Sequence, residues 1–520
     1  MTSTLPNPAL SRRRVVQAGA ATAGTAALVS IPSVAEAAVV ARYTRTPVPS
    51  RRERHVMDRF SYGHSTKLLK QMRKAGSPQE WFNQQLKPNQ IGDRYATGLK
   101  SWFPSLSYSP VESWKKNTSG EHPLWKQSTE FVGWSLLRRT YSNRQLLEVM
   151  TEFWSNHLHI PAVGDGSYPN RVSYDAAIRR HALGSYENLL KATITHPAML
   201  TYLDQGKSTK KAPNENLGRE LLELHTVGRK AYTESDVLNS ARILTGWKID
   251  YWDTWALTYE PSDHWTGAVK VLGFSDRNSD PDGRELTYRY LTYLARHPET
   301  AKRIARKVAV RFVSDNPSNE LVNHLTRVYL RNGTSIKAVL RAVINHPEFW
   351  KSVGGKVRTP NEDYVATYRA MGVRVTRPTA DDSAARSIIW QAQSMGQRPF
   401  GWPRPDGEPD DPEIWSSVGR MAGSFGVHYT IAGGWWPSKD IRYRPYAKWL
   451  PQRRIRLNAL VDHMSRKILG RKSTPALLDA VILATGYPAS EIIDAEHPLA
   501  RWRMPVLLQT LLDTPEHMTR

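Results

Sequence analysis

The sequence predicts a mainly α-helical protein, a multi-helix orthogonal or bundle-like domain with a small β or irregular insertion near residues 250–286. Two observations lead to this prediction. Apolar residues recur at helical spacing through most of residues 55–350, whereas a half-buried strand would alternate apolar and polar residues. In addition, residues 213–228 carry their own helix start and stop signals, and we interpret the rest of the chain around this stretch.

Residues 213–228 have the sequence P-N-E-N-L-G-R-E-L-L-E-L-H-T-V-G. Asn214 is a favourable N-cap, and Gly228 can adopt the left-handed conformation that often ends a helix. At 100° per residue Leu217, Leu221 and Leu224 share one face, and the charged and amide side chains fill the opposite arc. The stretch is therefore predicted to be a helix with one buried and one polar face.

The first 37 residues have the order of a twin-arginine (Tat) export signal. Arg12, Arg13 and Arg14 precede a weakly apolar stretch, and an A-x-A cleavage site ends at Ala37. We expect cleavage there and a secreted, extracellular protein that begins at residue 38. The apolar stretch is short and broken by glycine, so no transmembrane anchor is expected. Residues 38–54 are predicted to be a flexible basic lead-in.

The charge and the cysteine content limit the kinds of binding partner and of metal site that we expect. The 520 residues include 72 Lys and Arg against 48 Asp and Glu, a formal charge of +24, and no cysteine. The absence of cysteine excludes disulfides, a lipid-anchored cysteine and thiolate metal sites. The positive charge attracts polyanions in general, including anionic cell-wall polymers. No nucleic-acid-binding motif accompanies the basic residues, so we expect no nucleic acid partner.

Helix signals continue along the chain. We predict a helix from His55, a second one capped by Ser77, irregular structure over 88–125, and long helices over 130–200. Another helix is predicted to start at the cap Thr233. The alternation in 268–272 suggests a small hairpin, and helices resume from 287 to 350.

Three His-Pro pairs punctuate these helices. In each pair a helix ends at the histidine and the proline begins the next helix, because proline is suited to the first helical position. The pairs begin at His196, His297 and His346. Residues 351–520 are predicted to contain further helices around a loop rich in Trp, Pro and Asp.

The residues of 213–228, together with the following Y-T-E-S-D-V and A-R-I-L-T-G-W segments that end at Trp247, resemble the DUF1800 family, a group of bacterial proteins with no established activity. The aromatic-Asn-His segment ending at His157 also resembles this family. The resemblance implies a DUF1800-type helical core over 55–350, with 351–520 as the C-terminal part of the same domain. It also implies that a co-exported protein partner is possible.

One polar set combines several metal-ligand types on neighbouring predicted helices. The metal set would be His157, His181, Glu220 and Glu223, and any divalent metal cofactor remains unidentified. Acid–base catalysis would use Glu220, Glu223 and His225. The set lacks the H-E-x-x-H and E-x-x-H spacings of known metal motifs. The alternative is a polar network that locks the helices together.

Further residues are candidates for binding a ligand. On the central helix these are Asn214, Asn216 and Arg219, which lies one turn from both Glu215 and Glu223 and could bridge them. In the C-terminal loop, Trp402 could stack on a sugar ring while Asp406 bonds its hydroxyls. The prolines of that loop equally suit a rigid scaffold.

The remaining motifs do not point to a specific function. The Asp-rich stretch 276–283 resembles a calcium loop, but Arg289 stands where such a loop needs Glu, so a solvated turn is favoured. The sequence has no G-x-S-x-G elbow, phosphate loop or dinucleotide fingerprint.

The sequence thus leaves two functions open. The first is a secreted cell-envelope protein that hydrolyses or modifies a polymer by metal-assisted or acid–base chemistry. The alternative is a non-catalytic envelope protein that binds an anionic polymer or a protein partner. The sequence does not decide whether the protein is an enzyme.

Overall fold

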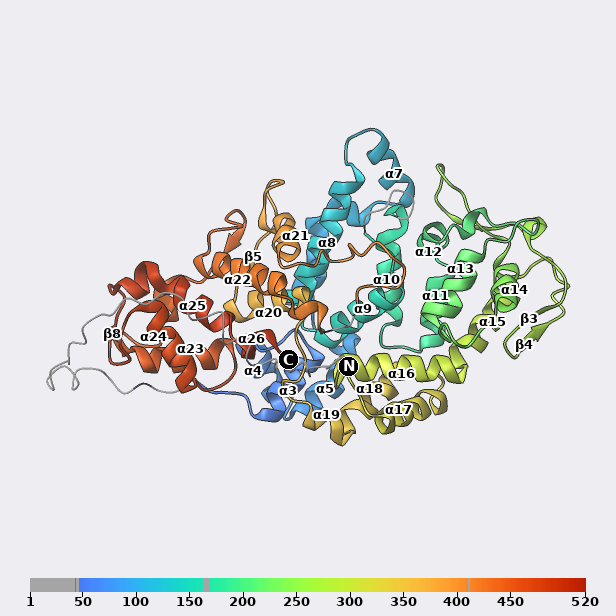
Figure 1. Cartoon of the computed structure of the whole chain (residues 1–520). Coiled ribbons are helices and arrows are strands. Elements are labelled where there is room, and N and C mark those ends of the chain that lie inside the picture. Colours follow the sequence, from blue (N-terminus) through green and yellow to red (C-terminus); the bar gives the residue numbers. More distant parts are fainter. Residues whose placement is uncertain (1–42, 44–45, 163–167, 410–411) are drawn as a thin grey trace, which may run out of the picture.

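The computed structural model describes residue 43 and residues 46–162, 168–409 and 412–520. The predicted export signal lies outside the described residues. Within them the protein is mainly α-helical, as predicted, and every sheet has two short strands. The molecule is elongated: α23, α24 and α25 lie at one end, and α14, α15 and the β3–β4 hairpin lie at the other (Figure 1).

The first helices form the centre of the molecule. They are α3 (Arg51–Phe60), α4 (Thr66–Lys74), α5 (Pro78–Gln85), α6 (Arg94–Gly98), α7 (Pro110–Thr118), α8 (Leu124–Tyr141) and α9 (Gln145–His157). Helix α3 starts earlier than predicted because Ser50 and Glu53 form a capping box. The Ser77 cap is confirmed. The stretch 88–125, predicted to be irregular, instead contains α6, α7 and short 3₁₀ turns, which local caps such as Ser109 support.

The middle of the chain contains α10 (Arg171–His181), α11 (Tyr186–Ile194), α12 (Pro197–Tyr202), α13 (Glu215–Glu220) and α14 (Glu234–Leu244). The central stretch begins where predicted, since the Asn214 side chain accepts the N–H of Asn216. It does not remain one α-helix. After Glu220 it widens into a π-helical turn, Leu221–His225, before Gly228 adopts a φ of 91°. The Thr233–Asp236 capping box of α14 is confirmed.

The insertion contains two hairpins rather than one. Strands β1 (Trp247–Ile249) and β2 (Leu257–Tyr259) pair antiparallel, and so do β3 (Val269–Val271) and β4 (Phe274–Asp276). The predicted alternation therefore does form a strand in β3, where Val269 and Val271 are buried and Lys270 is exposed. The Asp-rich stretch beyond β4 is a turn, and Arg289 forms an ion pair with Asp276 at 2.7 Å.

Helices then resume as α15 (Arg284–Arg296), α16 (Pro298–Phe312), α17 (Asn319–Arg331), α18 (Ile336–Asn345) and α19 (Pro347–Lys351). The three His-Pro pairs are confirmed as helix starts. In α12, α16 and α19 the histidine is the N-cap, its Nδ1 accepts a backbone N–H, and the proline stands in the first turn.

The C-terminal part contains α20 (Pro360–Met371), α21 (Ala384–Ser394), α22 (Val418–Gly433), α23 (Leu457–Ile468), α24 (Pro475–Thr485), α25 (Met504–Leu512) and α26 (Pro515–Met518). Two small sheets join distant segments: β5 (Arg374–Val375) with β6 (Ile441–Arg442), and β7 (Ile455–Arg456) with β8 (Ile492–Ile493). Helix α20 lies against both α8 and α22, so it connects this part to the centre.

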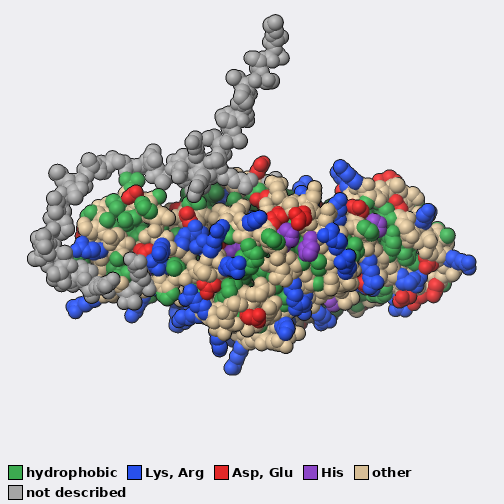
Figure 2. All heavy atoms as spheres, turned by 90° about the horizontal axis from the view of Figure 1, so that it is seen from below, with side chains coloured by type: hydrophobic (Ala, Val, Ile, Leu, Met, Phe, Trp, Pro, Cys, Tyr) green, Lys and Arg blue, Asp and Glu red, His purple; other side chains and the backbone are tan. Residues whose placement is uncertain are grey.

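A continuous apolar core runs from α3 through α25. Lys and Arg side chains are spread over the described part of the face drawn in Figure 2, with Asp and Glu scattered between them. Among the described residues no helix is both long and apolar enough to cross a bilayer.

Candidate functional sites

The carboxylates of the central helix lie near its surface. The Tyr232 hydroxyl donates to Glu223 at 2.6 Å, and the Arg229 Nε lies 3.0 Å from the same carboxylate. Glu220 is half-buried, and burial followed by the charge of Glu223 raises its pKa. Arg219 pairs with Glu234 at 2.6 Å and with Glu215 at 3.3 Å. It therefore does not bridge toward Glu223 as the spacing suggested, because Glu234, the first residue of α14, pairs with it instead.

His225, at the end of the π-helical turn, and His157, at the end of α9, lie next to each other in the interior. His225 Nδ1 lies 3.0 Å from the carbonyl of His157, and His157 Nε2 lies 3.0 Å from the Tyr186 hydroxyl. Burial lowers the pKa of both rings, that of His225 to about 4. Both histidines are therefore neutral at pH 7 and contact backbone and hydroxyl groups.

The predicted metal set is not brought together. His181 lies at the end of α10, and Glu220 and Glu223 lie toward the surface, whereas His157 is buried. Within the described part of the chain, the only group of three or more His, Asp or Glu residues with ligand atoms mutually within 4.8 Å is Asp363, His428 and His517. The acid–base role assigned to the central helix remains a prediction.

The two predicted sugar-binding residues contact each other. The Trp402 indole N–H donates to Asp406 at 2.7 Å, and Arg404 pairs with the same carboxylate at 3.2 Å. The loop lies near the central helix, since the charge of Asp406 helps to raise the pKa of Glu220. Asn214 and Asn216 form the helix cap, so the structure gives both asparagines a local role.

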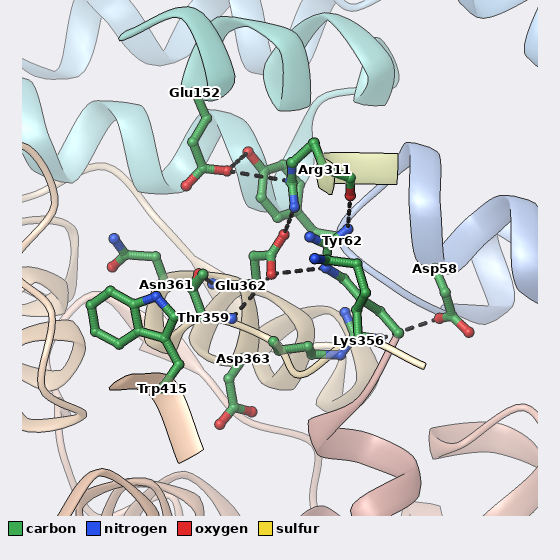
Figure 3. Close-up of polar contacts among 12 residues, drawn as sticks. Asp58, Tyr62, Glu152, Arg311, Lys356, Thr359, Asn361, Glu362, Asp363 and Trp415 are labelled. Atoms are coloured by element: carbon green, nitrogen blue, oxygen red, sulfur yellow. Dashed lines mark hydrogen bonds and ion pairs between the residues drawn. The ribbon is translucent and has the colours of Figure 1, made fainter. Parts of the chain in front are cut away.

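A buried ion network lies beneath these residues, where α9, α16 and α20 meet (Figure 3). Glu362 is paired with Arg311 and, at 3.0 Å, with Arg520. Burial raises the pKa of Glu362, but the two guanidinium groups outweigh it and hold the pKa well below its usual range. Glu152 accepts from the Tyr62 hydroxyl at 2.8 Å.

Beside the network lies a cavity of about 60 Å³, which Trp415 also lines. Lys356 at its edge is paired with Asp315, yet burial and the nearby Arg520 lower the pKa of Lys356 to about 8. Opposite charges meet throughout this region, and the cavity is too small for a sugar ring. The arrangement therefore suits a network that joins the helices.

A much larger cavity lies between α4, the end of α8, α20, β6 and α23. It has a volume of about 810 Å³. We call it the basic pocket because seven cationic side chains line it, whereas no Asp or Glu does among the described residues. The cationic residues are Lys67, Arg369, Arg374, Arg442, Arg444, Lys448 and Lys467. None of the seven forms an ion pair with any residue that the structure describes.

The inner cations of the basic pocket are held in place without being neutralised. Arg444 lies over the Trp449 ring at 4.3 Å, and the Lys467 ammonium approaches the same ring at 5.4 Å. Arg369 donates to the carbonyl of Thr140 at 3.0 Å. One buried guanidinium nitrogen of Arg444 and one of Arg369 have no hydrogen-bond acceptor in the described structure.

Burial, with a nearby like charge in two cases, lowers the pKa of three cations in this pocket. Burial and then Arg444 lower the pKa of Lys467 to about 8, and burial and then Arg358 lower that of Arg369 to about 10. Burial also lowers the pKa of Arg444. The folded protein thus holds cations together at a free-energy cost, which an anion would relieve.

Tyrosines complete the lining. Tyr141 accepts the N–H of Val375 at 2.9 Å and donates to the carbonyl of Val373 at 3.0 Å, so it fixes the strand that carries Arg374. Tyr368 and Tyr443 also face the cavity. Phenol groups and cations together can bind a ligand that carries both hydroxyl and acidic groups.

Comparison with known families agrees with the resemblance noted in the sequence. The model of the family described as "Protein of unknown function (DUF1800)" matches residues 55–519. The chain belongs to the DUF1800 family. No curated protein and no solved structure matches it significantly.

Sequence reasoning missed the basic pocket of this DUF1800 protein. Its residues come from segments between Lys67 and Lys467 that only folding brings together. One local signal was present: residues 442–449, R-Y-R-P-Y-A-K-W, interleave basic and aromatic residues and supply four of the side chains that line the pocket.

Proposed function

We propose that this DUF1800 protein binds an anionic ligand in the basic pocket and does so at the cell envelope, after export by the twin-arginine pathway. The ligand would be a phosphate- or uronate-bearing segment of a cell-surface polymer. The observation that carries the proposal is the set of seven cations without ion-pair partners that surrounds about 810 Å³ of space lined by no carboxylate among the described residues.

Electrostatics supports this proposal. In the buried Glu362 network, cations alternate with anions. In the basic pocket, burial and then the neighbouring Arg444 lower the pKa of Lys467, so the protein holds this charge at a free-energy cost. An anionic ligand removes this cost and satisfies the free guanidinium nitrogens of Arg369 and Arg444. Charge-assisted hydrogen bonds to such groups are among the stronger polar contacts.

The dimensions of the pocket support a polymer segment. A volume of about 810 Å³ lies within the usual range of small-molecule sites and exceeds the space that one phosphate needs. The exposed cations Lys67, Arg374, Arg442 and Lys448 stand at the rim, where a longer chain could leave the pocket.

Acid–base modification of a polymer at the central helix is the second candidate. It is favoured by one observation: burial and the charges of Glu223 and Asp406 raise the pKa of Glu220. Two neighbouring carboxylates with unequal proton affinities suit general acid and base roles. Trp402 lies on the adjoining loop and could support a sugar ring.

Calorimetric titration of the mature protein with two probes, sodium polyphosphate and an oligogalacturonate, tests the binding function. We expect binding that weakens as salt increases and that falls at least tenfold in the double variant Arg444→Gln/Lys467→Met. The matched control is Lys210→Gln/Lys211→Met, which removes two exposed cations from a loop outside the pocket. Equal losses in both variants would show that net charge alone attracts the probes and would refute a pocket site.

A further inference from the structure

A second cluster lies on the other side of α20 from the Glu362 network. Asp363 points away from Glu362 (Figure 3), because successive residues of a helix diverge by about 100°. His428 of α22 and His517 of α26 approach the same carboxylate oxygen, Oδ1, through their Nε2 atoms, at 3.1 Å and 3.5 Å. All three side chains are buried.

These separations fit a metal site. In a tetrahedral zinc site with bonds of about 2.0–2.1 Å, neighbouring ligand atoms lie about 3.3 Å apart. The two Oδ1–Nε2 distances fall on either side of that value. The imidazole rings are nearly perpendicular, at 78°, so both nitrogens can face one point without the rings clashing. The Thr367 hydroxyl also lies 2.9 Å from His517 Nε2, so it contacts the same ring nitrogen.

The groups behind two of the three ligands, His428 and Asp363, are also typical of a metal site. His428 Nδ1 lies 2.7 Å from Asp513, so that its Nε2 lone pair can face the ion. Metal-bound histidines usually donate their second N–H to such a carboxylate. The other oxygen of Asp363, Oδ2, accepts from Arg420 at 3.1 Å and Ser424 at 3.0 Å, which leaves Oδ1 for the ion.

We propose that Asp363, His428 and His517 bind a divalent transition-metal ion, zinc above all, in a structural site that joins α20, α22 and α26. Two imidazoles and a carboxylate are ligands that zinc favours. All three side chains are buried and come from three different helices, so an ion bound by them would join these helices to one another.

The competing explanation is a protonated His428 held between Asp363 and Asp513 with no metal. That arrangement accounts for two of the contacts of His428. It does not require His517 to direct a second ring nitrogen at Asp363 Oδ1. Metal content therefore separates the two explanations.

The test is zinc and cobalt binding by the full-length mature protein, purified without a polyhistidine tag. After incubation with Zn²⁺ and dialysis against metal-free buffer, we expect about one zinc per chain. Co²⁺ in its place should give the intense visible absorption of a four-coordinate site. A folded protein that retains no zinc and shows no such Co²⁺ spectrum would overturn the proposal.

Substitutions in and behind the three ligands test whether the ion binds at this cluster. His517→Gln should abolish retention of zinc, and Asp513→Asn should weaken it by about 10–100-fold, as changes behind a metal ligand do. His55→Gln is the matched control, since His55 is equally buried but lies on α3 and contacts the carbonyl of Phe349. Loss of zinc from the control, or full retention in folded His517→Gln, contradicts the assignment. If His517→Gln does not fold, the wild-type Co²⁺ spectrum decides.

Discussion

Replacing Lys467 with methionine should raise the stability of the ligand-free protein while it lowers the affinity for a polyanion. Methionine keeps most of the aliphatic stem that packs near Trp449 and removes only the ammonium group. For a residue with a merely structural role, a substitution that removes its contacts lowers stability. The two effects of Lys467→Met therefore have opposite signs only if the pocket holds the ammonium group at a free-energy cost that a ligand relieves.

The size of the stability effect follows from the pKa. Burial and Arg444 lower the pKa of Lys467 from 10.5 to about 8. At about 1.36 kcal/mol per unit this shift corresponds to at most about 3 kcal/mol. Because Lys467 is only half-buried, solvent screens much of the effect, and we expect a gain of about 1 kcal/mol in the free energy of unfolding at pH 7.

The stability of the wild type should depend on pH in a direction that the lowered pKa of Lys467 determines. At pH 7 Lys467 is charged in both the folded and the unfolded chain, so the whole cost is present. Between about pH 8 and 10.5 the unfolded chain holds more protons, and the stability of the wild type rises with pH. The advantage of Lys467→Met should therefore vanish by about pH 10.5. The affinity of the wild type for polyphosphate should start to fall above about pH 8, where Lys467 loses its proton.

Urea unfolding at pH 7 and pH 10.5 measures the stability, and calorimetric titration with polyphosphate measures the affinity. Loss of one charge-assisted hydrogen bond, about 1.5–3 kcal/mol, predicts an affinity at least tenfold lower. Lys211→Met serves as the control, with no expected change in stability and a small change in affinity. A destabilised Lys467→Met protein with unchanged affinity refutes the reasoning.

Three further predictions concern other parts of the molecule. Glu148→Gln should cost about 3 kcal/mol in urea unfolding because it removes the buried carboxylate that the partly buried Arg138 and Arg179 share, although Arg179 keeps Asp175. In the wild type, the stability that this carboxylate provides should be lost as the pH falls from about 4.5 toward 2, the pKa to which these arginines lower it against the effect of burial. Gly133→Ala should lower the free energy of unfolding by about 1–3 kcal/mol, because a Cβ there would lie 2.4 Å from the carbonyl oxygen of Ala385; an unchanged unfolding midpoint would contradict the close approach of α8 and α21. The double variant Glu220→Ala/Glu223→Ala should fold with little loss of stability, as judged by thermal unfolding, because neither side chain is fully buried; abolished polymer-modifying activity in that folded protein would favour the enzymatic alternative.

Local signals in the sequence predicted much of the fold. The caps Ser77, Asn214 and Thr233 act within a few residues of themselves, so the structure reproduces them. The β3 strand was also predictable, because alternation is local. The same rules missed the π-helical turn after Glu220, since widening of a helix depends on what packs against it rather than on its own sequence.

The candidate sites were less predictable. The pocket cations lie on segments far apart in the sequence, and only tertiary packing shows that no carboxylate accompanies them. The Asp363, His428 and His517 cluster has no motif spacing for the same reason. Conversely, the carboxylates of residues 213–228 could be predicted to lie together because they are close in the sequence. Glu220 and Glu223 are indeed neighbours, but His181 comes from a distant segment and does not join them.

The His-Pro helix starts give the molecule a shared response to acid. In α12, α16 and α19 the cap is a ring nitrogen that accepts a backbone N–H, at 3.2 Å in His196 and His297 and at 3.3 Å in His346. Protonation of that nitrogen removes the acceptor, so each of these helices loses its anchor when its histidine becomes charged. Burial and the charge of Arg171 lower the pKa of His196 to about 4, which preserves the start of α12 in mild acid. Amide hydrogen exchange at Ala198 and Glu299 should therefore report the acidity at which the starts of α12 and α16 begin to fray.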